Sequence, residues 1–193
     1  LHVTEHSFPT RRSSDLHNAW GSENTTIKDV RYEHCAAVNC GRYGAFNAWV
    51  TGFDFAEQNN IEGLRVSNCF AEGSLESGFH FEWDPKKRDC VFINCVSKDN
   101  GQKPWPDTYL VGGPDYFGAG FYLPGGRVSL VNCRAEGNRA FGFFVGNPDG
   151  MLLYNCTENG TGSRPVVGRS ARPIGYCILQ SLPVTKNPSV VMD

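Results

Sequence analysis

The sequence predicts an all-β fold, a solenoid of short strands wound into about five visible coils. Three observations lead to it: a recurring cysteine, a recurring glycine, and alternating apolar stretches on either side of the cysteine. A repeat of roughly two dozen residues whose length varies only in its loops is typical of a solenoid with stacked neighbours. The repeat cysteines are Cys35, Cys69, Cys95, Cys133 and Cys156.

Composition and charge narrow the class of protein. At 193 residues, with 22 Gly, 11 Pro and 40% hydrophobic residues, the chain fits one β-rich, loop-rich domain. Its 18 basic and 20 acidic residues give a formal charge of -2, which argues against nucleic acid as the main partner. The apolar runs are far too short to predict a membrane span. No feature of the sequence indicates an oligomeric state.

The first residues are set apart from the fold. Ser7 to Leu16 reads SFPTRRSSDL, which resembles the translation of a common sequencing adapter. We therefore expect residues 1–16 to be an artefactual leader, and the natural N-terminal portion, with any signal peptide, to be missing. We expect residues 17–180 to form the solenoid, and residues 181–193 to form a tail or the start of a further coil.

The strand before each cysteine alternates between inward and outward positions, and one register satisfies all five copies. Every inward residue is aliphatic, aromatic or sulfur-bearing. The inward pairs are Val30 and Tyr32, Leu64 and Val66, Cys90 and Phe92, Val128 and Leu130, and Met151 and Leu153.

The residue before the cysteine is predicted to sit at a sharp bend. Asn tolerates the left-handed backbone conformation, and its amide can bond to the Asn stacked above it. Four copies have Asn there and the first has His34, so we expect a ladder of Asn68, Asn94, Asn132 and Asn155. In the strand after the cysteine, the second inward position is small or polar: Ala37, Ala71, Ser97, Ala135 and Glu158.

The glycine opens the last strand of each copy. Gly44, Gly78 and Gly142 lie nine residues after their cysteine, whereas Gly120 and Gly175 lie twenty-five and nineteen residues after theirs. Two copies therefore carry insertions at one equivalent place, Val96 to Ala119 and Thr157 to Ile174.

This pattern resembles the right-handed parallel β-helix of the pectin-lyase-like family, over roughly Ile27 to Gln180. The resemblance implies a single-stranded right-handed helix with three parallel sheets and an asparagine ladder between the second and third. It places Gly78 to Trp83 on the first sheet, Leu64 to Ser67 on the second and Cys69 to Glu72 on the third.

The repeat cysteines are predicted to be buried thiols. Stacked strands bring their Cα atoms to about 4.8 Å, within disulfide range, but side chains in register point the same way. Cys35 with Cys40 stays open as a local pair. We expect no metal and no cofactor, because no Cys-x-x-Cys occurs and the five His are scattered.

Candidate chemistry lies on the outward column of the first sheet. Counting from the repeat glycine, this column reads Phe46, His80, Tyr122 and Phe144. Four adjacent rings could form a flat surface on which sugar rings stack, or could stabilise neighbouring strands or lie under a loop. Both interpretations stay open.

Two acids follow His80 at alternate positions. Glu82 and Asp84 project from the same face, and two residues along a strand span about 6.6 Å. That is near the lower limit of the carboxylate separation in inverting glycosidases, roughly 6.5 to 9.5 Å. Exposed acids are also ordinary at the end of a strand.

The insertions are predicted to rise beside the first sheet as one wall of a groove. They supply Trp105, Tyr116 and Arg164, while Lys86, Lys87 and Arg88 leave coil two on the opposite side. Aromatic and basic groups around acids favour a groove for a polysaccharide, in particular an anionic one.

The sequence therefore predicts an extracellular or cell-surface carbohydrate-active β-helix, either a glycoside hydrolase or a polysaccharide lyase. In hydrolysis, Glu82 and Asp84 would be the acid and the base. In elimination, His80 or Tyr122 would take the proton. The Asn-Thr-Asp, Asp-Asp and Gly-His-Gly motifs of the polygalacturonase relatives do not occur. The alternative is a noncatalytic surface or adhesin-like module.

Overall fold

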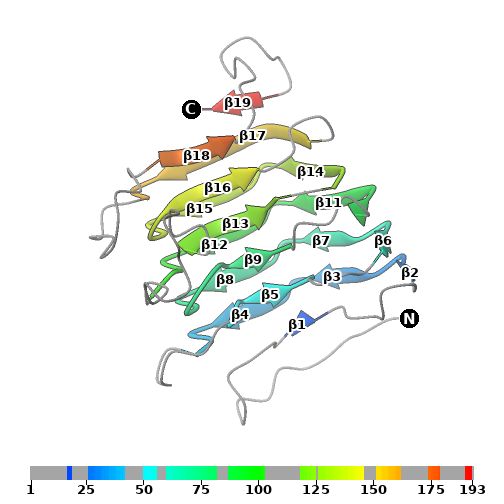
Figure 1. Ribbon diagram of the computed structural model, residues 1–193, viewed down its shortest axis with the longest axis horizontal. Coiled ribbons are helices and arrows are strands. Elements are labelled where there is room, and N and C mark those ends of the chain that lie inside the picture. Colours follow the sequence, from blue (N-terminus) through cyan, green and yellow to red (C-terminus); the bar gives the residue numbers. More distant parts are fainter. Residues whose placement is uncertain are drawn as a thin grey trace, which may run out of the picture.

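The computed structural model describes residues 17–18, 26–41, 50–55, 60–81, 87–102, 118–124, 126–145, 151–161, 174–178 and 190–192. Within these ranges the regular structure is entirely strand, without an α-helix. Every strand pairs in parallel with its neighbours. The chain winds into a stack of coils in which each strand lies beside its equivalent in the next coil (Figure 1). The prediction of an all-β parallel β-helix is confirmed.

The first sheet has six strands in the order of the coils. They are β1 (His17–Asn18), β5 (Phe53–Asp54), β9 (Phe79–His80), β13 (Ala119–Leu123), β16 (Phe141–Val145) and β18 (Ile174–Ile178).

The second and third rows form one large sheet, because the long strand β17 (Met151–Asn159) belongs to both rows. The second row contains β3 (Arg31–Glu33), β7 (Arg65–Ser67), β11 (Cys90–Ile93) and β14 (Val128–Val131). The third row contains β4 (Ala36–Val38), β8 (Phe70–Glu72), β12 (Val96–Lys98) and β15 (Arg134–Glu136). The last strand, β19 (Val190–Met192), pairs with β17.

A short three-stranded sheet was not anticipated. It contains β2 (Thr26–Lys28), β6 (Asn60–Glu62) and β10 (Lys87–Arg88), which precede the second row in coils one to three. Coil two therefore runs through β6, β7, β8 and β9 before the chain enters coil three.

Left-handed residues mark the corners of the coil. Between the second and third rows, His34, Asn68, Asn94, Asn132 and Asn155 all have φ between 50° and 54°. The asparagine amides bond along this column: Asn94 Nδ2 donates to Asn68 Oδ1 at 3.2 Å, Asn132 to Asn94 at 3.2 Å, and Asn155 to Asn132 at 2.8 Å. Asparagine tolerates the left-handed backbone of this bend, and Asn94, Asn132 and Asn155 each link their coil to the preceding one.

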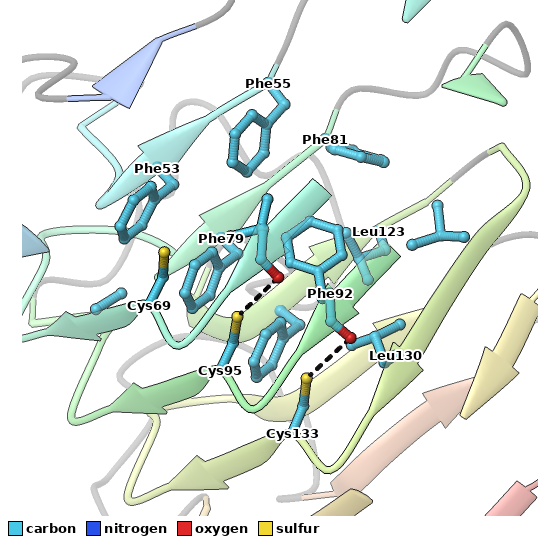
Figure 2. Close-up of a cluster of buried hydrophobic side chains, with 14 of the residues drawn as sticks. Phe53, Phe55, Cys69, Phe79, Phe81, Phe92, Cys95, Leu123, Leu130 and Cys133 are labelled. Atoms are coloured by element: carbon cyan, nitrogen blue, oxygen red, sulfur yellow. Dashed lines mark hydrogen bonds between the residues drawn. The ribbon is translucent and has the colours of Figure 1, made fainter. Parts of the chain in front are cut away.

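The core is a stack of phenylalanines from the first sheet. The inner column, Phe53, Phe79, Phe121 and Phe143, has successive ring centroids 4.7, 4.8 and 4.9 Å apart, with nearly parallel planes. Phe92, from the second row, meets Phe79 edge-on (Figure 2). Phe92 also meets Phe121 edge-on. The described inward residues of the second row are buried, apart from the half-buried Val30, so the predicted register is confirmed.

The structure contains the predicted glycine column on the first sheet, but the first member of the column is Gly52 and not Gly44. β5 pairs with β9 through Phe53 and Phe79, which puts Gly52 in register with Gly78 and leaves Gly44 outside the column. A Cβ on Gly52 would lie 2.7 Å from the Gly78 carbonyl oxygen, and one on Gly78 would lie 2.9 Å from the Gly120 oxygen. The close approach of stacked backbones explains why glycine is needed at these positions. Coil one also has an insertion of its own in the sequence before Gly52.

Candidate functional site

The outer column of the first sheet consists of Asp54, His80, Tyr122 and Phe144. Strand pairing aligns Asp54 with His80, His80 with Tyr122, and Tyr122 with Phe144. Successive strand residues face opposite sides of a sheet, so these side chains point away from the inner column. Asp54 takes the place predicted for Phe46, and that assignment is wrong because coil one is eight residues longer than assumed.

Three side chains of the outer column stack. The His80 and Tyr122 rings have centroids 4.8 Å apart with planes inclined at 24°, and Tyr122 and Phe144 are 4.9 Å apart at 20°. Their relative exposures are 1%, 0% and 0%. Tyr122 and Phe144 belong to a small apolar cluster separate from the main core, with Ala119, Ala140 and Phe141. The expectation of an open aromatic surface is therefore wrong, whereas the alternative of a covered, stacked ladder agrees with this burial.

Each outer-column residue has a companion three positions earlier. In coil two, Ser77 Oγ lies 2.9 Å from His80 Nδ1. In coil four, the equivalent pair is Phe141 and Phe144, with ring centroids 5.6 Å apart. The companions are Thr51, Ser77, Ala119 and Phe141.

The character of these pairs changes along the stack. Coils three and four carry Ala119 with Tyr122 and Phe141 with Phe144, which form the apolar cluster. Coils one and two carry Thr51 with Asp54 and Ser77 with His80, all of them buried. A polar half and an apolar half therefore meet where His80 stacks on Tyr122.

The polar half contains groups of the kind that take part in proton transfer. His80 has an imidazole fixed by Ser77, and the register places a carboxylate, Asp54, on the adjacent strand. Among the described residues, Thr51 Oγ1 is buried without a hydrogen-bond partner. The combination of imidazole, carboxylate and hydroxyls is that of a general acid–base site.

The other predicted site residues fall into two groups. Glu82, Asp84, Phe46, Trp105, Tyr116 and Arg164 lie outside the described residues.

The two described basic residues that follow coil two, Lys87 and Arg88, lie on β10 of the three-stranded sheet. Arg88 is exposed on β10 of the three-stranded sheet, in register with Glu62. Lys87 is fully buried, because it occupies the inward position that Ile61 holds in the preceding coil. The expectation that Lys87 is a surface group of a groove is wrong.

Asp54 and Ser77 were missed from the sequence, although a signal was present. Gly52 to Phe55 reads GFDF, and Gly78 to Phe81 reads GFHF. Aligning these two segments, rather than counting nine residues from the cysteine, places Asp54 beside His80.

Two absences concern the described part of the chain, a metal-binding cluster and a membrane-spanning helix. There, no group of three or more His, Cys, Asp or Glu side chains is arranged to hold a metal ion. No helix in the same ranges has the length and apolar character needed to cross a bilayer.

The fold is shared with a pectate lyase. The crystal structure of pectate lyase Pel9A matches this chain with a TM-score of 0.54 and 20% sequence identity. The match covers 78% of this chain and 40% of that one, so the chain spans well under half the length of that enzyme. No family model and no curated protein matches the sequence. At this identity the likeness shows the β-helix fold alone.

Proposed function

We propose that this protein acts on a polysaccharide outside the cell or at its surface, and that His80 is the group that transfers the proton. The observation that carries the proposal is the buried Ser77–His80 pair on the outer face of the first sheet, next to Asp54. The likeness to a pectate lyase supports polysaccharide as the substrate class.

The stability of the fold does not explain why Ser77 and His80 are buried at this position. Burying a polar group without full compensation costs free energy, whereas the apolar pair Phe141 and Phe144 fills the equivalent position two coils later. Buried titratable groups that break a structural pattern are concentrated at functional sites. The apolar pairs of coils three and four therefore show which residues this position holds when packing alone decides, and the polar pairs of coils one and two depart from that.

Elimination is the chemistry that these groups fit best. His80 would remove the proton beside a uronate carboxylate, and Asp54 would stabilise the imidazolium that forms. Hydrolysis would instead use Glu82 and Asp84 as acid and base. Tyr122 and Phe144 support the His80 ring from one side in either case.

The substrate must displace whatever covers the outer column, because His80 is 1% exposed. A closed, dry site strengthens the electrostatic interactions within it. The proposal therefore includes a change in the accessibility of His80 on binding, which His80 imidazole resonances report directly in a titration with oligosaccharide.

A panel of acidic and neutral polysaccharides tests the proposal. Reducing-end release reports any cleavage, and unsaturated products report elimination. His80→Gln keeps a hydrogen-bonding group near Ser77 but should lower the rate about 10²- to 10⁴-fold, the usual contribution of acid–base catalysis. Tyr122→Phe is the matched control, because it keeps the stacked ring, and should retain most activity.

Two results would contradict the proposal. Full activity in His80→Gln would remove His80 from the chemistry. Binding without cleavage of every acidic and neutral polysaccharide would favour the noncatalytic surface module.

A further inference from the structure

The repeat cysteines form a ladder of free thiols inside the solenoid. Strand pairing on both sides of the corner aligns Cys35 with Cys69, and the same register continues to the last coil. The described cysteines are all free. The thiol ladder consists of Cys35, Cys69, Cys95, Cys133 and Cys156.

Among the five ladder cysteines, only Cys35 is accessible to solvent. Cys69 is 1% exposed and the three later thiols are fully buried. Cys35 is half-buried. A reagent in solution therefore reaches the ladder first at Cys35.

The ladder sulfurs lean toward the preceding coil. Cys69 Sγ donates to Ser67 O at 3.3 Å in its own coil and to Tyr32 O at 3.6 Å in coil one. Cys95 Sγ repeats this geometry, with Val66 O at 3.4 Å (Figure 2). Although the side chains are in register, Cys69 thus directs its sulfur toward the coil that carries Cys35.

Distance also selects Cys69 as the partner. Adjacent parallel strands bring in-register Cα atoms to about 4.8 Å, inside the 4.4 to 6.8 Å range of disulfides. Cys40 is separated from Cys35 by the extended strand β4, which advances about 3.3 Å per residue. Its Cα therefore lies beyond the roughly 7 Å limit, and the local pair Cys35–Cys40 is disfavoured.

We propose that Cys35 and Cys69 are a redox-active pair that closes to a disulfide between coils one and two when a small-molecule disulfide reaches Cys35. This inference is independent of the polysaccharide site, because it concerns the opposite corner of the coil.

The reaction balances with oxidised glutathione as the oxidant. The Cys35 thiolate attacks one glutathione sulfur, which forms a mixed disulfide and releases one glutathione thiolate. Cys69, deprotonated, then attacks the Cys35 sulfur and releases the second glutathione. Two protein thiols lose two electrons and two protons, and one glutathione disulfide is reduced to two thiols.

The second step should be the slow one. The hydrogen bond with Cys95, together with burial, raises the pKa of Cys69 well above its ordinary value. Little thiolate is therefore present at neutral pH, and the glutathione adduct on Cys35 accumulates first. Raising the pH should speed its conversion to the disulfide.

Peptide mapping of a Cys177→Ser chain tests the proposal without altering the ladder. Cys177, whose side chain lies outside the described residues, is first replaced by Ser so that it cannot compete. After incubation with oxidised glutathione, mass spectrometry should find a Cys35 adduct and then a Cys35–Cys69 linked peptide. Cys35 should react roughly tenfold or more faster than any other described thiol.

Two variants separate the steps. Cys69→Ala should stop the reaction at the Cys35 adduct, and Cys90→Ala, which removes a buried thiol outside the ladder, should leave the linked peptide unchanged. A persistent adduct in the parent chain at high pH would overturn the proposal, as would a Cys35–Cys40 link or a Cys35 that does not react.

Discussion

Replacing Tyr122 by Ala distinguishes a structural ring from a sugar-binding ring. Tyr122 is 0% exposed and stacks between His80 at 4.8 Å and Phe144 at 4.9 Å. Truncating a fully buried aromatic side chain typically costs about 3–5 kcal/mol, which includes the loss of stacking worth about 0.5–1.5 kcal/mol per pair. We therefore expect Tyr122→Ala to lower the free energy of unfolding by about 3–5 kcal/mol.

Urea denaturation followed by tryptophan fluorescence and circular dichroism measures this loss, provided that the two probes give coincident transitions. Tyr154→Ala is the matched control, because Tyr154 is 53% exposed on the second row and should lose less than about 1 kcal/mol. If Tyr122→Ala stays within about 1 kcal/mol of the parent while oligosaccharide binding weakens, the ring is a binding surface and not a structural ring.

Substitutions of Asn94, Gly78 and Cys90 test the columns of the solenoid by the same measurement. Asn94→Ala should lower the free energy of unfolding by about 1–2 kcal/mol, because it removes two ladder hydrogen bonds and places alanine in a left-handed backbone with φ 53°. Asn94→Gly should lower it by less, because glycine tolerates that backbone. Gly78→Ala should lower the free energy of unfolding by about 1–3 kcal/mol, because its Cβ would overlap Ser97 Oγ, whereas the Cβ of Gly118→Ala meets nothing nearer than 3.3 Å. Burial raises the pKa of Cys90 from 9.0 to about 12. Between these values the unfolded chain has lost the thiol proton that the folded chain keeps, so stability should fall as the pH rises, and Cys90→Ala should flatten that fall.

The repeat could be read from the sequence because stacking imposes it. Each inward side chain packs on its equivalent in the next coil, so Leu64, Val66 and Phe92 keep their apolar character at fixed positions around the cysteine. The bend needs a left-handed residue in every coil, which explains Asn68 and its equivalents. The same requirements for an apolar inward residue and a left-handed bend recur in each of the five copies, so they can be recognised in the sequence.

The position of Asp54 could not be obtained from a fixed spacing, because loop length is not constrained by stacking. A solenoid tolerates an insertion wherever the chain leaves one sheet, since longer loops add little closure entropy. Gly44 fitted the nine-residue count by coincidence, and strand pairing shows that Gly52 holds the position. The burial of His80 also could not be predicted from the repeat, because alternation along a strand predicts only which side of the sheet a side chain faces.

The inner and outer columns of the first sheet differ in how strictly packing determines the residue type. The inner column contains phenylalanine in four successive coils, because each ring stacks on an identical ring less than 5 Å away. The outer column changes from acid to imidazole to phenol to phenyl over the same four coils, on strands with the same backbone geometry. Packing therefore fixes the residue type in the inner column but not in the outer one. Where packing leaves the choice open, a buried acid beside a buried imidazole needs a chemical explanation, and proton transfer supplies one.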